Sequence, residues 1–202
     1  MPASNTNIFN FLERMKMLSA ITRFGTLPFR NKESVSEHSF NVAFIAMLIS
    51  DHEPELKANN ELILRRALMH DFPETITSDI PYQIKHRYSD GKLAEALNEI
   101  ENDLIENEIF DELPTNIKVR YIEISKMSKD TLESKIVKAA DAIDVVLTAM
   151  KEINLGNKYF DHVYEIGMKL LAGYSDLKFV KAFVRGVDKY KKGGNPHIDM
   201  QE

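Results

Sequence analysis

Histidine and carboxylate side chains occur at three places in the sequence where apolar residues surround them. His38 lies near the start of one apolar stretch, His70 and Asp71 are adjacent at the end of another, and Asp141 lies within a third. Two imidazoles and two carboxylates can supply four nitrogen and oxygen ligands to one divalent metal ion, with positions left open for water and a phosphate oxygen. These four residues are therefore candidate metal ligands.

Each of these residues also has a structural interpretation. A single histidine on a core-facing helix surface is more often a hydrogen-bonded structural residue than a ligand. Asp71, with Glu74 three residues later, also fits a helix N-cap and its capping-box partner. Asp141 could pair with a cation of a neighbouring helix, and Asp144, one turn later, competes with it as a ligand. The combination in one chain favours a metal site.

Helices must position these side chains, because apolar residues recur at helical spacing almost throughout and no stretch alternates convincingly over the length of a strand. The sequence therefore predicts an all-α protein. The expected helices cover residues 9–19, 36–50, 61–70, 92–110, 131–153, 160–172 and 177–191, with a shorter one after 113–115. Residues 23–34 and 71–89 are rich in turn formers, and the second of these stretches is where a site is expected.

Local signals set the expected helix boundaries. Ser36, with Glu37 in the first turn, can begin a central helix that directs His38 into the core. Pro73 ends the helix of residues 61–70, because proline disfavours helical geometry in the residue before it.

Apolar stripes on two other helices complete this expectation. The first helix carries a stripe of Phe9, Leu12 and Met15, with two further apolar residues, Phe11 and Leu18, beside it. In the helix of residues 131–153, Asp141 lies between Val137 and Val145 on a stripe that is expected to be buried. An unpaired buried carboxylate costs several kcal/mol, so Asp141 requires a cation, a metal ion or a proton.

Composition limits the possible classes of protein. The 202 residues are 44% hydrophobic with 8 Gly and 7 Pro, which indicates one well-filled domain over 1–202. Within it we expect a metal-binding core at about 23–150, C-terminal helices at about 158–191 and a flexible tail at 193–202. There is no cysteine, so disulfides, thiolate nucleophiles and cysteine-ligated metals are excluded.

Charge and hydropathy indicate which partners and which cellular compartment to expect. With 26 Lys and Arg against 31 Asp and Glu, the net charge is −5, which argues against a nucleic-acid partner. The longest apolar run, residues 42–49, is far shorter than the roughly 20 residues that span a bilayer, so no membrane partner is expected. Residues 1–10 do not have the pattern of a signal peptide, and we expect a cytoplasmic protein.

Four ordered motifs resemble one known superfamily. They are Val-Ser-Glu-His-Ser at 35–39, His-Asp-Phe-Pro-Glu at 70–74, Ser-Asp-Ile-Pro at 78–81 and Lys-Ala-Ala-Asp at 138–141. The pattern is similar to that of the HD-domain metal-dependent phosphohydrolases, which are all-α helical proteins. Within that superfamily it resembles the YfbR-like 5′-deoxynucleotidases, over about residues 23–141 and more loosely over most of the chain.

This resemblance implies a hydrolase that removes phosphate from nucleoside or deoxynucleoside 5′-monophosphates. It implies that His38, His70, Asp71 and Asp141 bind Co²⁺, Mn²⁺ or another divalent ion, and that Glu74 orients or deprotonates the attacking water. A homodimer is expected on the same basis.

The resemblance also implies three substrate contacts. Arg23 would hold the phosphate, and Asp79 would accept a hydrogen bond from a sugar hydroxyl. Phe24 stands where the bacterial deoxynucleotidases have tryptophan, so an aromatic wall beside the sugar is retained without the indole N–H.

Other functions remain open from the sequence. One alternative is a non-catalytic HD-fold module that senses a nucleotide. Another is a hydrolase of a different nucleotide such as guanosine tetraphosphate, whose family has His-Asp-x-x-Glu-Asp where this chain has Thr75 after Glu74. The basic stripe formed by Lys181, Arg185 and Lys189 is typical of a solvated helix face.

Overall fold

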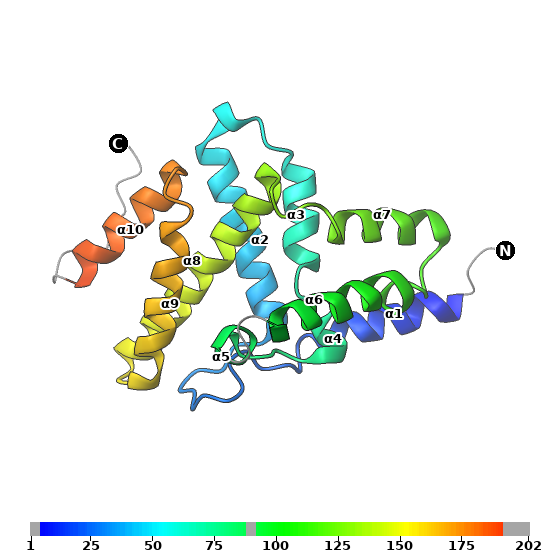
Figure 1. Ribbon diagram of the computed structural model, residues 1–202, viewed down its shortest axis with the longest axis horizontal. Helices are drawn as coiled ribbons and strands as arrows, with labels where there is room; N and C mark the ends of the chain where they lie inside the picture. The colour runs from blue at the N-terminus through cyan, green and yellow to red at the C-terminus, as the bar shows by residue number, and fades with distance from the viewer. Residues whose placement is uncertain (1–4, 88–91, 192–202) are drawn as a thin grey trace. The chain divides into compact units, whose positions relative to one another are not determined.

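Helices and turns make up the structure, a computed structural model that describes residues 5–87 and 92–191 (Figure 1). The elements are α1 (Asn5–Met17), α2 (Val35–His52), η1 (Pro54–Leu56), α3 (Asn60–Met69), α4 (Glu74–Thr77), α5 (Tyr82–Arg87), α6 (Lys92–Leu104), η3 (Ile105–Ile109), α7 (Thr115–Ser125), α8 (Leu132–Asn154), η4 (Lys158–Phe160), α9 (Asp161–Ala172) and α10 (Lys178–Lys191). Within the described ranges the only β-type pairing is an isolated antiparallel bridge between Thr22 and Ser34. The all-α prediction is confirmed.

Several predicted helix boundaries differ from the structure: the first helix, expected over 9–19, is Asn5–Met17, and the central helix ends at His52 rather than near residue 50. The central helix α2 begins at Val35 rather than Ser36, because Ser34 provides the cap: its Oγ accepts from Glu37 N, and Glu37 Oε2 accepts from Ser34 N. This reciprocal pair is a capping box. The continuous helix expected over 92–110 ends at Leu104 and passes into the π-helical turn η3. The predicted tail, 193–202, lies outside the described residues.

Residue contacts divide the chain into two compact units. The first unit comprises Met1–Phe40 and Leu68–Ser128, and the second comprises Asn41–Ala67 and Lys129–Glu202. The helices α2 and α3 each contribute residues to both units. A single domain over 1–202, with its core at about 23–150, stays a prediction.

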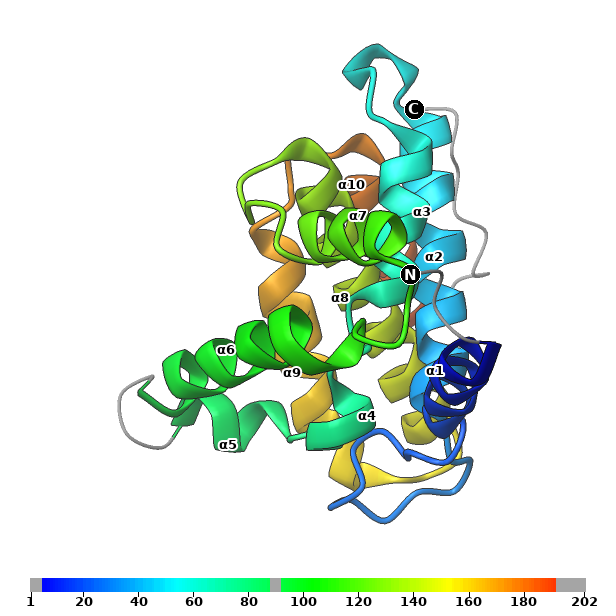
Figure 2. The ribbon, with the colours of Figure 1, turned by 90° about the vertical axis from the view of Figure 1, so that its right-hand side faces the viewer.

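An apolar cluster organises the first unit. Its buried members come from well-separated segments and are Leu18, Val35, Phe72, Ile105, Ile109 and Phe110. The Phe72 ring stacks on Phe11 with centroids 5.4 Å apart, and it lies 6.0 Å from Phe110. The cluster therefore joins α1, the start of α2, the segment after α3, and η3. In Figure 2, α1 and α4 lie side by side, and these two helices contact each other.

The apolar residues of α1 do not face the core as one stripe. Phe11 packs against the apolar cluster, whereas Phe9, Leu12 and Met15 are all exposed; Leu18, which directly follows the helix, is buried within the cluster. The stripe that the sequence shows on this helix is therefore on its outer surface.

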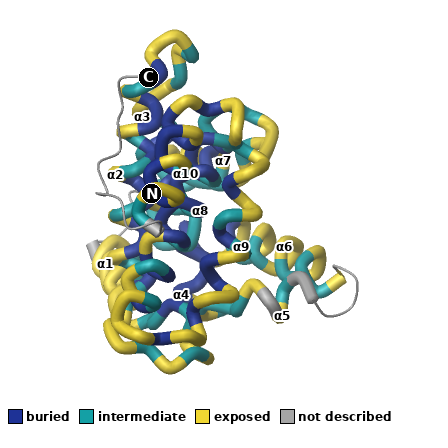
Figure 3. The backbone as a smooth tube through the Cα atoms, turned by 90° about the vertical axis from the view of Figure 1, so that its left-hand side faces the viewer, coloured by how far each residue is buried: buried dark blue, intermediate teal, exposed yellow. Residues whose placement is uncertain are grey.

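Among the described residues of α6 none is buried, and Figure 3 shows this helix in the colours of exposed and intermediate residues.

Helix α8 is the centre of the second unit and packs along α9 (Figure 1). Thr131 caps α8 by accepting from Ser134 N. The buried Glu53 carboxylate accepts from Phe179 N, 3.0 Å away, in the first turn of α10. A carboxylate at this end of a helix is favoured by the helix dipole. No helix of the described chain combines the length and the apolar character needed to cross a membrane.

Candidate active site

The position of His38 follows from the capping box at the start of α2. The box fixes Val35 as the first helical residue, and His38 N donates to Ser34 O at 3.1 Å, so the imidazole lies one turn into the helix. Val35 is fully buried in the apolar cluster, and His38 itself is 1% exposed. The prediction of a core-facing His38 is confirmed.

His70 and Asp71 follow directly after the end of α3, and the buried Phe72 holds them in place. Asp71 Oδ2 lies 3.2 Å from His70 Nε2 and 3.4 Å from His38 Nε2. The two imidazole Nε2 atoms are 3.3 Å apart. Three side chains from two segments, 32 residues apart in sequence, thus converge on one point.

This convergence suits a divalent metal ion. Three or more histidine or acidic residues can hold a metal ion when their ligand atoms lie close together. In the part of the chain that the structure describes, His38, His70 and Asp71 form such a group, with ligand atoms that all lie within 4.8 Å of one another. A ligating carboxylate must be ionised. Burial would raise the pKa of Asp71, but the charge and hydrogen bond of His70, with the charge of Arg23, outweigh it and hold that pKa well below its usual range. The residues present therefore fit the ion.

The alternative interpretation of Asp71 as a helix cap is wrong. Pro73 occupies the N-cap of α4, and no side chain makes a capping hydrogen bond there. The Asp71 carboxylate is directed to the two imidazoles instead.

Asp141 lies on α8, in the second unit, whereas the other three candidate ligands lie in the first. Its neighbour Val137 is buried as expected, but Asp141 is only half-buried and Asp144 is 2% exposed. The Asp141 charge adds to burial in raising the pKa of Tyr174. The role of Asp141 as the fourth ligand stays a prediction.

Glu74 begins α4 and is 8% exposed. Its Oε2 is buried and has no hydrogen-bond partner among the described residues. Burial, together with the charges of Asp71 and Asp79, raises its pKa to about 9, and Lys85 and Arg23 oppose this shift only in part. A buried carboxyl group with an unused oxygen is a marker of function rather than of stability.

The three predicted substrate residues contact one another in series, and Arg23 also contacts His38. Arg23 Nη1 lies 2.6 Å from His38 Nδ1, and Arg23 Cζ lies 4.9 Å from the centroid of the Phe24 ring. Phe24 has a φ of 51°, a left-handed conformation that is strained for a bulky side chain, and its N donates to Asp79 Oδ2 at 2.6 Å. Asp79 therefore holds the backbone that presents Arg23 and Phe24.

Glu33 was not singled out by the sequence. Its carbonyl accepts from Arg23 N at 2.9 Å, and its Oε2 lies 3.8 Å from Arg23 Nη1. The bridge between Thr22 and Ser34 brings the two residues together. No local spacing signals such a contact, because it depends on the path of the whole loop over residues 23–34.

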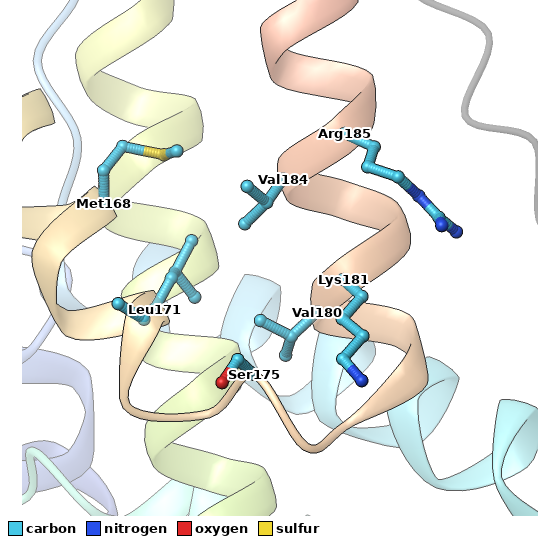
Figure 4. A pocket seen from close by; sticks show the side chains of 8 residues that line it. Met168, Leu171, Ser175, Val180, Lys181, Val184 and Arg185 are labelled. Atoms are coloured by element: carbon cyan, nitrogen blue, oxygen red, sulfur yellow. The ribbon is translucent and has the colours of Figure 1, made fainter.

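A separate cavity in the second unit lacks this chemistry. It has a volume of about 320 Å³, and its lining is mostly apolar: Met168, Leu171, Ala172, Ser175, Val180, Lys181, Val184 and Arg185. In Figure 4, Val180 and Val184 point from α10 toward Leu171, while Arg185 points away from them. The basic stripe therefore borders an apolar cavity, and no histidine or carboxylate lines it.

Comparison with known proteins identifies the family of this chain. The pattern of the family described as 5′-deoxynucleotidase YfbR-like matches residues 9–189. The 5′-deoxynucleotidase of Photorhabdus laumondii is 30% identical over 184 residues, which is 88% of this chain and 92% of that protein. The chain belongs to the YfbR-like 5′-deoxynucleotidase family. The resemblance inferred from the four motifs is thereby confirmed, as is the prediction of a hydrolase.

Solved structures place this YfbR-like chain in the HD fold. An HD-domain phosphohydrolase from Listeria innocua has a TM-score of 0.82 and 27% identity, and the match covers 94% of this chain and 91% of that one. The HD phosphohydrolase of cyanophage S-2L, solved with dA and one catalytic Zn²⁺ ion, has a TM-score of 0.56 and 19% identity, covering 82% and 81%. The second likeness supports the fold alone.

The raised pKa of Glu74 predicts an unusual pH dependence for the metal-stripped protein. Between 4.5, the ordinary pKa, and about 9, the folded state keeps a proton that the unfolded state has lost. Because the folded state binds more protons, the free energy of unfolding should fall as the pH rises through this range. The Gln side chain of Glu74→Gln stays neutral at every pH, so this variant should show a flatter dependence of the free energy of unfolding on pH. Urea unfolding over this pH range, with a chelator present, measures that dependence.

The exposed Glu165 provides the control, because its side chain is 75% exposed. In Glu165→Gln the free energy of unfolding should change with pH as it does in the wild type. The same pH dependence in Glu74→Gln as in the wild type would contradict the raised pKa.

Proposed function

We propose that the chain is a metal-dependent 5′-nucleotidase that removes phosphate from nucleoside or deoxynucleoside 5′-monophosphates. The observation that carries this proposal is the cluster of His38, His70 and Asp71, with Arg23 in contact with it. The same site holds Glu74, whose carboxyl has an unused oxygen. Membership of the YfbR-like family and the relative named a 5′-deoxynucleotidase support the choice of substrate.

The metal would be held by His38, His70 and Asp71, with Asp141 as the proposed fourth ligand. Co²⁺, Mn²⁺ or another divalent ion suits two imidazoles and two carboxylates. When bound, such an ion supplies a Lewis acid for a phosphate oxygen and lowers the pKa of water toward neutrality.

Glu74 is the proposed general base. It must be ionised to take a proton from the attacking water, and its pKa of about 9 applies to a site that contains no added cation. Positive charge beside Asp71 would favour the ionised carboxylate. The buried position of Glu74 keeps bulk water from competing for its oxygen atoms.

Arg23 and Phe24 are the proposed substrate contacts. The guanidinium can make paired, charge-assisted hydrogen bonds to a phosphate, and the flat Phe24 ring can line the sugar. Asp79 is proposed as the acceptor for a sugar hydroxyl, with the oxygen atom that does not accept from Phe24 N. The smaller ring of Phe24, compared with tryptophan, would leave more room at the sugar.

Substitutions in the cluster test catalysis directly. Asp71→Ala should abolish phosphate release from nucleoside monophosphates in the presence of Co²⁺ or Mn²⁺. Glu74→Gln should lower kcat by about 10²–10⁴-fold and keep the affinity for nucleotide, because only proton transfer is lost. Phosphate release and equilibrium nucleotide binding measure the two quantities.

His162→Gln is the control, because the His162 side chain on α9 is 55% exposed. This substitution should change neither kcat nor the affinity for nucleotide. A nucleotide-sensing module has no turnover to lose. Inactivity of the wild type across a panel of nucleotides, with bound metal verified, would refute the proposed function.

The two roles of Asp79 predict a second result. Asp79→Ala removes the acceptor for Phe24 N and should raise KM about tenfold, the value of one charge-assisted hydrogen bond. Asp79→Asn keeps an oxygen acceptor and should recover most of that loss. Matched ribose and deoxyribose substrates should be compared, and equal KM values for both variants would contradict this role.

We also propose a cytoplasmic homodimer in which α1 contributes to the interface. Phe9, Leu12 and Met15 are exposed on this helix, with 60%, 48% and 43% of their surface accessible. Leu12→Glu should shift the protein toward monomer in sedimentation velocity, whereas Asn10→Glu, at an exposed polar position, should not. A wild type that sediments as a monomer at every concentration would contradict the dimer.

A further inference from the structure

The contact between Arg23 and His38 has a consequence for metal loading. Arg23 Nη1 is 2.6 Å from His38 Nδ1, and both residues are nearly excluded from solvent, with 9% and 1% of their surface exposed. The Arg23 backbone is fixed by its hydrogen bond to Glu33 O, and the guanidinium is flanked by Glu33 Oε2 and the Phe24 ring. The contact is therefore a buried, well-supported hydrogen bond.

The chemistry of the two groups determines the direction of this bond. A guanidinium has five N–H donors, no acceptor, and a pKa above 12, so it only donates. His38 Nδ1 must therefore present its lone pair. In a neutral imidazole the proton is then on Nε2, which faces Asp71 Oδ2 at 3.4 Å and His70 Nε2 at 3.3 Å.

A metal ion on His38 Nε2 requires the opposite tautomer. The ion takes the Nε2 lone pair, so the ring proton must be on Nδ1. An Nδ1–H and a guanidinium N–H would then face each other as two donors at 2.6 Å. The hydrogen bond from Arg23 and a metal at Nε2 therefore exclude one another.

We infer that Arg23 is a latch on His38 that is released when the metal binds, which makes the guanidinium available to the substrate phosphate. This inference rests on the proposed function, because it takes His38 as a ligand and Arg23 as the phosphate contact. Before loading, Arg23 holds the imidazole in the tautomer that cannot ligate through Nε2. After the metal binds, the Arg23 backbone stays bonded to Glu33, while the Arg23 side chain leaves His38 and can bind the substrate phosphate.

The latch couples the two binding events. Any anion that draws Arg23 from His38 favours the ligating tautomer, and any ion that takes Nε2 frees the guanidinium. By linkage, each event must increase the affinity for the other by the same factor. Arg23 therefore acts as a positioning residue before it acts as a substrate contact.

The tautomer of His38 provides the direct test. Imidazole ¹⁵N resonances of the full chain should be recorded in phosphate-free buffer, first without metal and then with Zn²⁺, and assigned with His38→Gln. The expected result is a proton on Nε2 without metal and on Nδ1 with Zn²⁺. A proton on Nδ1 before zinc is added, or a tautomer that zinc does not change, would overturn the inference.

Metal affinity provides a second test. Arg23→Met removes the competing hydrogen bond, so calorimetry should show zinc binding tighter by roughly tenfold or more, the value of one bond to a charged group. Lys85→Met is the matched control, because Lys85 also acts on this site through its charge but is not bonded to His38. Equal tightening in both variants, or none in Arg23→Met, would overturn the latch.

These readouts separate the inference from the proposed function. Zinc that binds and leaves the His38 tautomer unchanged overturns the latch alone, whatever the phosphatase activity. Zinc that does not bind to the His38 site overturns the proposed metal ligands and the latch together. Active wild-type enzyme with a switched tautomer supports both.

Discussion

Apolar burial in the first unit determines where the polar groups of the site lie. Val35 and Phe72 belong to the same buried cluster, and each is close in sequence to a candidate ligand. Val35 begins the helix that carries His38, and Phe72 directly follows His70 and Asp71. An imidazole and a carboxylate gain little from burial themselves, so apolar neighbours must supply the free energy that holds them there. The geometry of the candidate metal site is thus a product of packing.

Electrostatic balance around the site is local and differs from that of the whole chain. The net charge is −5, yet Arg23 and Lys85 both act on the carboxyls at the site. Asp71 is held ionised by His70 and Arg23, while Glu74, three residues later, is held protonated by burial and by nearby carboxylates. Two acids in one short segment therefore have opposite protonation states in the absence of an added cation, and positive charge beside Asp71 would have to ionise Glu74 before it could act as a base.

Much of this could be predicted from the sequence because helical periodicity and short motifs are local. Most helix boundaries agree to within a few residues, and the His38, His70 and Asp71 group was found from residue type and spacing. The cap at Ser34 was missed by two residues because Ser36 offers the same hydroxyl chemistry.

Contacts that depend on the path of the chain were not predictable. The approach of Glu33 to Arg23 needs the bridge between Thr22 and Ser34, and no periodicity encodes it. The outward orientation of Phe9 and Leu12 could not be inferred, since an apolar stripe looks the same whether it meets the core or another surface. For α4, four residues are too few for a periodic signal.

The backbone of Phe24 also has a consequence for what holds the aromatic ring at the site. A left-handed conformation costs a bulky residue about 1–2 kcal/mol, and the hydrogen bond from its N to Asp79 contributes a similar amount of stabilisation. The Asp79 carboxylate therefore offsets most of the conformational cost of this turn. Without that carboxylate, Phe24 would gain free energy by leaving the left-handed conformation, and its ring would turn away from its present position beside Arg23.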